Sequence, residues 1–237
     1  MPKENGIWTL RGLSLEEPGC LRSPEELEAY VERVGFLPLF AGAVPGFSVE
    51  EHTAADHWWT GDRYDPWEWR KSLPAGRRLL YGKFFAGKAG YIARDWFPEF
   101  ANWRRNGYDF DSLYEDELAS HRSKKIMDLF RDREELLSPE VRQLAGFASG
   151  EKNFEGAITA LQMQTYLVSA GLRQRQNKAG RPYGWAVTVY TTPERLCGYD
   201  FVTSRYADEP LACRGRILEQ LRTLYGAGEA AALAALG

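Results

Sequence analysis

The sequence predicts an α+β protein whose second half is a module of three helices followed by a β-hairpin. Between residues 111 and 165 apolar side chains recur with helical spacing, and two strand-like runs follow, TYLVSAGLR and GWAVTVY. A polar, basic segment, QRQNKAGRPY, joins these two runs. This is the order of elements in a winged helix, in which the hairpin is the wing. The residues before the module combine helical and strand-like patterns with many aromatic side chains, which predicts an N-terminal α/β part.

The first half of the chain contains clear start and stop signals. Ser23, followed by proline and by glutamate three residues later, predicts the start of a helix that Gly35 ends. Residues 36–47 are rich in glycine and proline, so we expect a loop there. Two apolar runs around the turn AGKAG predict a β-hairpin over 78–93, and a helix is expected over 95–106.

The second half is predicted to be mainly helical before its hairpin. We expect two helices that meet near His121, a short helix from Ser138 to Gly146, and a third helix that begins at Phe154. A last helix is expected over 211–225, and the alanine-rich end GAGEAAALAALG is expected to be solvated or frayed. The predicted regions are an N-terminal aromatic-rich α/β region at 1–110, a winged-helix domain at 111–192 and a C-terminal helical tail at 193–237.

Composition excludes several classes of protein. With 237 residues, of which 44% are hydrophobic, the chain can bury a core of normal size without disulfides or a structural metal. Its three cysteines, Cys20, Cys197 and Cys213, are far apart and form no CxxC pair, which is typical of a reduced, cytoplasmic protein. The first ten residues show no basic region followed by an apolar run, so we expect no signal peptide. No apolar run has the length of a membrane span, and no metal-hydrolase motif occurs. We therefore expect no cofactor, no metal and no membrane association.

Charge is segregated along a chain whose net charge is only −3. No Asp or Glu occurs between Gly156 and Pro193, and the same interval carries a charge of +4. A basic cluster on a projecting hairpin is what phosphate contacts require, so we expect double-stranded DNA as the partner. The alternative is a solvated turn that is basic by chance. The residues assigned to nucleic-acid binding are Arg173, Arg175, Lys178 and Arg181.

The third helix of the module is poorly equipped to read bases. In projection, the face opposite its apolar stripe consists of Gly156, Thr159, Ala160 and Met163. Base-edge readout favours Arg, Lys, Asn or Gln at such positions. This face argues against a sequence-specific repressor and is compatible with recognition of DNA shape or damage.

The stretch HWWTGDRYDPWEWRK, residues 57–71, holds four of the eight tryptophans among acidic and basic residues. Base excision needs an aromatic slot for a flipped base and a carboxylate or amide that positions water and stabilises positive charge on the sugar. Asp62 and Asp65 are the candidate catalytic carboxylates. The alternative is that the tryptophans are core residues and that both aspartates cap turns, as aspartate does before glycine or proline. The candidate pocket residues are Trp58, Trp59, Trp67 and Trp69.

Four motifs together resemble those of a known family. WWTGDRYDPWEWRK, DWFPEF, FEGAITALQMQTYLV and NKAGRPYGWAVTVY look like the bacterial proteins called AlkZ-related, distant relatives of the AlkZ/YcaQ winged-helix DNA glycosylases. The resemblance covers most of Leu27 to Asp200. It implies a winged-helix, DNA-binding protein related to enzymes that excise alkylated or crosslinked bases.

The glycosylases carry a Gln-x-Gln or Gln-x-Asp motif, and this chain contains Gln162-Met163-Gln164. In the family the motif precedes most of the winged-helix array, whereas here it lies inside the third helix of the module. Residues two apart on a helix point about 200° from each other, so the two glutamines are not expected to line one pocket. We interpret them as amides at the edges of the apolar stripe.

The leading hypothesis is a DNA-binding winged-helix protein, related to DNA glycosylases, that recognises or excises damaged, alkylated bases. One alternative is a non-catalytic winged-helix module that binds DNA or a protein. Another is a protein that binds a small ligand in the tryptophan pocket. A cleft with one positive face and one aromatic-acidic face would favour the glycosylase-related protein. A buried tryptophan cluster without a cleft would favour the non-catalytic module. A closed pocket remote from the wing would favour the small-ligand-binding protein.

Overall fold

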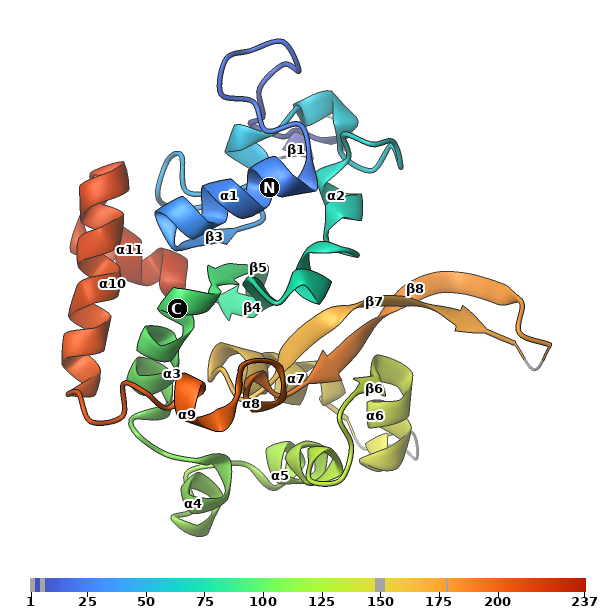
Figure 1. The fold of residues 1–237 in the computed structure, drawn as a ribbon, viewed down its shortest axis with the longest axis vertical. Helices are drawn as coiled ribbons and strands as arrows, with labels where there is room; N and C mark the ends of the chain where they lie inside the picture. The colour runs from blue at the N-terminus through green and yellow to red at the C-terminus, as the bar shows by residue number, and fades with distance from the viewer. Residues whose placement is uncertain (1–2, 5–6, 148–151, 178) are drawn as a thin grey trace.

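Helices pack around one long antiparallel sheet in the computed structural model of this protein. The structure describes residues 3–4, 7–147, 152–177 and 179–237. Within these residues the sheet has six strands in the order β3-β5-β4-β7-β8-β6 (Figure 1). A separate short pair is formed by β1 (Lys3–Glu4) and β2 (Ile7–Trp8). The sheet strands are β3 (Phe36–Pro38), β4 (Leu79–Phe85), β5 (Lys88–Ala93), β6 (Leu136–Leu137), β7 (Val168–Gln176) and β8 (Pro182–Thr191).

The sheet joins two hairpins that are distant in the sequence. The β4–β5 hairpin was predicted, and so were the two strands of the wing, β7 and β8. Tyr81 of β4 pairs with Ser169 of β7, so the first hairpin continues into the second. One buried cluster packs around β3, β4 and β5, and a second lies among the helices below the wing. The wing therefore starts where both clusters meet the sheet.

Two strands of this sheet were not expected. Residues 36–47 were predicted to be a loop, yet Phe36–Pro38 form β3 and pair with β5. Leu136–Leu137 form β6 inside a stretch that was predicted to be helical, and they pair with Tyr190 and Val189 of β8. Both strands are very short, and both are held by pairing with residues distant in the sequence. The local sequence pattern therefore does not predict them.

The first helix of the chain follows its sequence signals. α1 (Pro24–Val34) begins after Ser23, whose hydroxyl accepts the Glu26 N–H at 3.2 Å, and it ends at Gly35, which has φ of 95°. This left-handed conformation suits glycine because a Cβ would clash there. The other helices of this part are α2 (Pro66–Trp69) and α3 (Phe97–Arg105).

A layer of helices lies below the wing, on the side of the second buried cluster (Figure 1). Along the chain, α5 precedes β6, α6 and α7 follow it, and the wing comes last. The helices of this part are α4 (Phe110–Glu115), α5 (His121–Met127), α6 (Ser138–Leu144), α7 (Phe154–Met163), α8 (Pro193–Cys197) and α9 (Tyr199–Val202).

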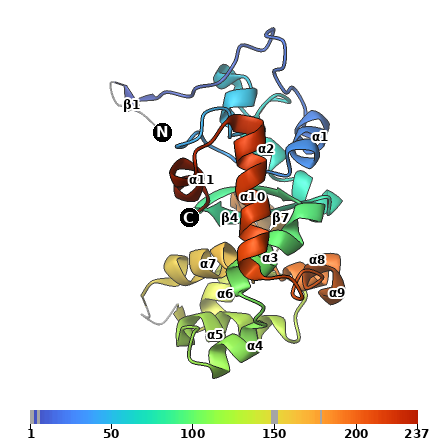
Figure 2. The ribbon, with the colours of Figure 1, turned by 90° about the vertical axis from the view of Figure 1, so that its left-hand side faces the viewer.

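The C-terminal residues pack against the N-terminal half. α10 (Pro210–Tyr225) lies along α3, and α11 (Glu229–Leu236) turns back toward β4 (Figure 2). Leu236 is fully buried, and its carbonyl accepts hydrogen bonds from Ala86 N–H at 3.0 Å and from the Arg104 guanidinium at 2.9 Å. The expectation of a solvated or frayed end is therefore wrong. The alanine-rich helix buries its few larger side chains on a surface that the sequence alone does not reveal.

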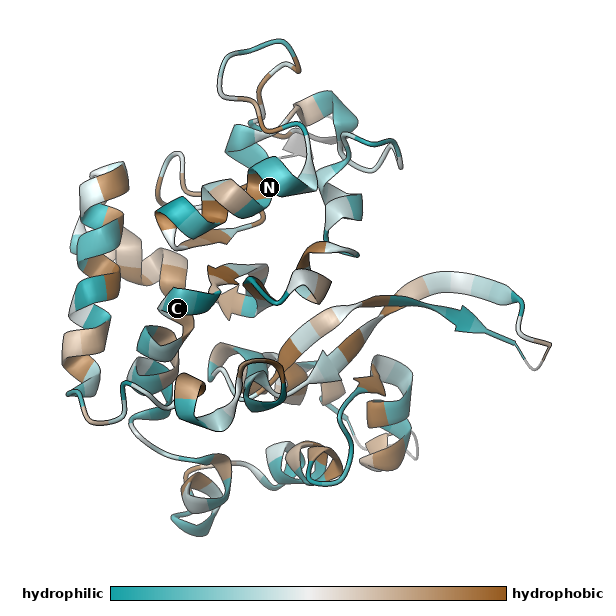
Figure 3. Ribbon diagram, viewed as in Figure 1, coloured by the Kyte–Doolittle hydropathy of each residue, from teal (hydrophilic) through white to brown (hydrophobic). Residues whose placement is uncertain are grey.

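The wing projects from the body as a two-stranded ribbon (Figure 1). Its root is apolar and its outer part is hydrophilic (Figure 3). Along β8 exposure falls from the tip to the root: Tyr183 and Trp185 are exposed, whereas Val189 and Tyr190 are buried. The root thus belongs to the core of the protein, and the outer part is free to contact a partner.

Candidate functional site

The four tryptophans of residues 57–71 divide into two pairs. Trp58 is only 5% exposed and donates its indole N–H to the Thr53 hydroxyl at 3.0 Å. Trp69 is also buried, and its indole N–H donates to a backbone carbonyl. Trp59 is 45% exposed and Trp67 is half-buried, with 6.2 Å between their ring centroids. Trp58 and Trp69 therefore belong to the core, while Trp59 and Trp67 reach the surface.

Asp65 organises the turn that carries these rings. Its carboxylate is 1% exposed and accepts three backbone N–H groups, from Trp59 at 3.1 Å, Gly61 at 2.9 Å and Trp67 at 2.8 Å. It is also the N-cap of α2, as a turn-capping aspartate should be. Trp59 has φ of 63°, a left-handed conformation that is costly for a residue with a Cβ. The hydrogen bonds to Asp65 hold this strained backbone and keep the Trp59 ring at the surface.

Asp62 lies in a different environment on the same turn. Its carboxylate is exposed, accepts the Tyr64 N–H at 2.8 Å and bonds to Nδ1 of His57 at 2.7 Å. The hydrogen bond from His57 holds the pKa of Asp62 below its usual range. Asp62 does not line the cleft described next, whereas Asp65 does.

A cleft of about 660 Å³ separates the tryptophan turn from the wing. Trp59, Trp67 and Arg70 form one wall, and Gln174 and Trp185 belong to the other. Trp185 is 91% exposed, the highest value among the large apolar side chains of the described chain. An indole this exposed offers a large apolar surface beside the cleft.

Sequence reasoning did not select Trp185, although it singled out the motif that contains it. A usable signal was present, because this tryptophan lies in the interval without acidic residues, next to the basic turn of the hairpin. Aromatic side chains interleaved with cations are typical of surfaces that stack nucleic-acid bases. The weight given to the four tryptophans of residues 57–71 obscured it.

The basic residues of the wing differ in how free their charges are. Arg173 is exposed but forms an ion pair with Glu135 at 2.8 Å. The Arg175 guanidinium lies over the Tyr183 ring, 4.8 Å from its centroid. Arg181 is exposed near the turn, and Lys178 lies outside the described residues. Arg175 and Arg181 are therefore the described cations best placed for phosphates.

The outward face of α7 is partly covered by the first hairpin. Thr159 accepts a hydrogen bond from Lys83 of β4 at 3.2 Å, and Met163 lies close to the C-terminal Gly237. Of the four residues predicted on this face, only Ala160 is exposed, and Glu155 beside it is acidic. This helix is not free to enter a DNA groove along its length, so the β7–β8 hairpin is the more accessible element.

The family follows from comparison with known proteins. A family model described as AlkZ related matches residues 21–236. The chain belongs to the AlkZ-related family. No curated protein and no solved structure matches the chain. The matched span includes the tryptophan turn, the cleft and the wing.

The two glutamines of this AlkZ-related chain lie in different surroundings. Gln162 is buried; its amide oxygen accepts the Lys83 N–H at 3.0 Å, and its amide nitrogen donates to the Ile158 carbonyl at 3.3 Å. Gln164 is half-exposed and ends α7. Gln162 ties α7 to β4, and the two side chains do not share hydrogen-bond partners in the described structure.

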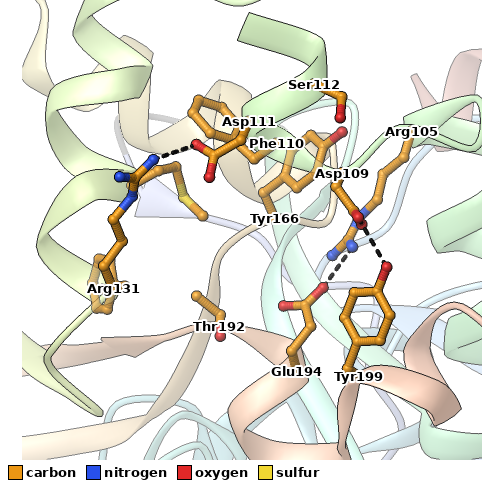
Figure 4. Close-up of a pocket in the computed structure, with 12 residues that line it drawn as sticks. Arg105, Asp109, Phe110, Asp111, Ser112, Arg131, Tyr166, Thr192, Glu194 and Tyr199 are labelled. Atoms are coloured by element: carbon orange, nitrogen blue, oxygen red, sulfur yellow. Dashed lines mark hydrogen bonds and ion pairs between the residues drawn. The ribbon is translucent and has the colours of Figure 1, made fainter. Parts of the chain in front are cut away.

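Another pocket, of about 330 Å³, lies among α4, α5 and α8, and its charges pair with one another (Figure 4). The buried Arg105 guanidinium bonds to Glu194 at 2.6 Å, and the Tyr199 hydroxyl donates to Asp109 at 2.8 Å. Asp111 pairs with an arginine at the rim in the same way. These contacts tie together the segments that line the pocket, and they leave few polar groups free to bind a ligand. The cleft beside the wing is therefore the better candidate site.

Other classes of site are not evident in the described parts of the chain. No group of three or more His, Cys, Asp or Glu side chains there is arranged to hold a metal ion. Cys20, Cys197 and Cys213 are free thiols, and burial raises the pKa of each. No helix among the described residues is long and apolar enough to cross a membrane.

Proposed function

We propose that this protein binds double-stranded DNA through its wing and receives an unstacked base in the cleft between Trp59, Trp67 and Trp185. The exposure of Trp185 beside a cleft walled by two further indoles is the observation that carries the proposal. Stacking of a base on an aromatic side chain contributes about 1–3 kcal/mol and does not depend on base identity. Such a site suits a base that has left the duplex, as damaged bases do most easily.

The order α5, β6, α6, α7, β7, β8 supports a winged-helix domain at 111–192. The short strand β6 lies between the first and second helices and pairs with β8 beside the wing, which is consistent with such a module. Because α7 is partly covered by the β4–β5 hairpin, we assign DNA contact to the wing. Recognition would then depend on shape and damage more than on sequence.

The charge of the wing sets a limit on its salt dependence. The interval without acidic residues carries four cations, and one of them, Arg173, is already paired with Glu135. Each phosphate contact contributes about 0.9 to the slope of log K against log salt, so the slope should be no steeper than about −4. Moderate duplex affinity with added affinity for a damaged site is the expected behaviour.

Binding to labelled duplexes with an intact, an abasic or an alkylated site, measured by fluorescence anisotropy over a range of salt, tests this proposal. Replacing Arg175 and Arg181 together by alanine should flatten the salt slope by about 2. Arg222→Ala, on the exposed face of α10 and paired with Glu219, is the matched control and should bind normally. Absence of binding at low salt, or an unchanged slope in the double variant, would exclude the wing as a DNA-binding surface.

Excision of the received base is the finer part of the proposal and is supported by the relation of AlkZ-related proteins to DNA glycosylases. Asp65 has both carboxylate oxygens engaged by backbone N–H groups, whereas Asp62 keeps an exposed carboxylate bonded to His57. Asp65 is the one of the two that lines the cleft, so if the received base is excised there, Asp65→Asn should abolish its release from an alkylated duplex. Because the Asp65 carboxylate is already bonded to backbone N–H groups, the structure also supports the alternative, a non-catalytic module that binds damaged sites. Undiminished base release in both Asp62→Asn and Asp65→Asn would mean that other residues catalyse the excision.

A further inference from the structure

A smaller cavity of about 240 Å³ lies next to the cleft and shares lining residues with it. Trp67, Arg70 and Leu172 line both spaces, so they form the boundary between them. The charged residues of the smaller cavity are Arg70 and Lys83, and no carboxylate of the described chain lines it. A cavity with two cations and no anion presents a positive potential to whatever enters from the cleft.

Arg70 is buried without a carboxylate partner. It is 9% exposed, its Nε donates to the Trp67 carbonyl at 2.7 Å, and its guanidinium carbon lies 3.3 Å from the centroid of the Trp67 ring. No ion pair involves it among the residues that the structure describes. Arg105, the other buried arginine named above, pairs with Glu194 at 2.6 Å. Buried charges are normally paired, because removal from water is costly. Arg70 lacks such an anion.

Three residues that carry hydroxyl groups line the same cavity from the sheet, and the hydroxyl of one of them, Ser169, already bonds to the Gly171 backbone. Tyr81, Ser169 and Tyr190 lie in register across β4, β7 and β8, and all three line the cavity. Tyr91 continues this row on β5, where its buried hydroxyl has no hydrogen-bond partner among the described residues, and its ring centroid lies 5.0 Å from that of Tyr81. Hydroxyls beside a guanidinium and an ammonium are the donors that bind phosphate oxygens.

Lys83 is loosely held, which leaves it free to turn toward a ligand. It is half-exposed and bonds to the Thr159 hydroxyl at 3.2 Å, and the only carboxylate near it in the described structure is that of Glu155 at 3.8 Å. An exposed pair at this distance contributes little stability. Reorienting Lys83 toward an anion would therefore cost little.

We propose that the cavity bounded by Arg70, Lys83, Tyr81 and Tyr190 is a phosphate-binding site. Its volume is below that of a typical ligand pocket, which suits a phosphate group better than a whole nucleotide. The three lining residues that it shares with the cleft put the two spaces side by side, so the cleft would take the attached sugar and base. The choice of a nucleotide phosphate rests on the proposed function. The phosphate belongs either to the bound strand or to a free nucleotide.

Calorimetry and tryptophan fluorescence with inorganic phosphate, a deoxynucleoside 5′-monophosphate and the unphosphorylated deoxynucleoside test this site. Phosphate and the monophosphate should bind, and the deoxynucleoside should bind at least about tenfold more weakly. Arg70→Met and Lys83→Met should each weaken binding of the monophosphate by about tenfold or more. Lys88→Met, an exposed lysine on the same hairpin that lines neither space, is the control and should bind normally.

Arg70→Met also removes the cation from the Trp67 ring, so its unfolding midpoint must be compared with that of the native protein. Lys83→Met decides the question if Arg70→Met does not fold, because Lys83 is half-exposed. Equal affinity for the monophosphate and the deoxynucleoside, or unchanged affinity in the folded variants, would overturn the site. Oligonucleotides with and without a 5′-phosphate distinguish a phosphate of the bound strand from that of a free nucleotide. A site for a free nucleotide should bind the monophosphate more tightly than both oligonucleotides.

The outcome is separable from that of the proposed function. Duplex binding that depends on the wing, without binding of phosphate or monophosphate, would overturn the cavity and leave the DNA-binding proposal standing. Binding of the monophosphate that Arg70→Met and Lys83→Met abolish, without duplex binding, would support the cavity and exclude the DNA-binding proposal.

Discussion

The tryptophan turn and the wing use the same kinds of residue in opposite ways. In the turn, Trp58 and Trp69 fill the core, and the Asp65 carboxylate accepts hydrogen bonds from three backbone N–H groups. In the wing, Trp185 and Tyr183 are exposed beside arginines that have few acidic neighbours. The turn is the denser motif in the sequence, yet the wing offers the larger exposed aromatic surface. A concentration of aromatic residues in the sequence therefore indicates dense packing, and it does not by itself show which of the rings face a ligand.

The two regions need each other at the cleft. The turn is rigid because Asp65 fixes the strained backbone of Trp59, so its rings form a preformed wall. The wing supplies the opposite wall from a ribbon that is anchored only at its root. A rigid wall that faces a projecting ribbon can admit a bulky group and then contact it from both sides. Changes in the turn should therefore alter the stability of the protein, and changes in the outer wing should alter its affinity.

The largest effect is expected from Asp65→Ala. Removing the carboxylate leaves three backbone N–H groups without their acceptor in a buried turn, and it removes the N-cap of α2. We expect a loss of about 3 kcal/mol in the free energy of unfolding, measured by urea denaturation. Asp62→Ala, two residues beyond Thr60 on the exposed side of the turn, should leave the unfolding midpoint unchanged. Equal stability of both variants would show that the turn does not depend on its buried cap.

Trp185→Ala should give the reverse pattern. Loss of one stacking surface should weaken binding to a duplex that contains an alkylated base by about ten- to a hundredfold, or about 1–3 kcal/mol. The unfolding midpoint should not move, because the side chain is 91% exposed. Trp58→Phe is the matched control: it loses the bond to Thr53 and should lower stability without changing affinity. A destabilised Trp185→Ala protein with normal affinity would remove the distinction between the two regions.

Local signals in the sequence were sufficient for much of the fold. Ser23 and Gly35 bound α1 because capping and left-handed backbone are properties of single residues, and the hairpin over 78–93 followed from apolar runs around a turn. The strands β3 and β6 were missed because two or three residues carry no usable period and are fixed by partners far along the chain. The end of the chain was misjudged because α11 packs against β4 and buries Leu236, and that surface exists only in the folded protein.

The candidate site was predictable only in outline. The tryptophans, the acids and the basic wing were recognised, but which indoles face solvent depends on how the turn packs against the sheet. Asp65 and Asp62 are equivalent in the sequence and differ in the structure through three hydrogen bonds. Trp185 and Arg70 were overlooked because exposure and the lack of a buried partner are properties of tertiary structure, which periodicity does not report.

A second contrast lies within the wing itself. Its tip is solvated, but its root is packed like the core around Val189 and Tyr190. Burial raises the pKa of Tyr190 to about 12, with a further contribution from the Glu155 charge. The folded state therefore favours the neutral hydroxyl, which is also the form that can donate to a phosphate oxygen.

This contrast predicts that the free energy of unfolding falls at alkaline pH because Tyr190, at the root of the wing, ionises. Because the folded pKa of Tyr190 is raised, its contribution to stability is complete below the ordinary value of 10.0 and is lost as pH rises toward about 12. At a pH of about 11 the expected loss is about 1 kcal/mol relative to neutral pH. Urea unfolding of the native protein and of Tyr190→Phe across this interval isolates the effect, since the variant has no phenol to ionise at that position. An identical pH dependence in both proteins would mean that the root is hydrated like the tip, and the wing would then be a single solvated element.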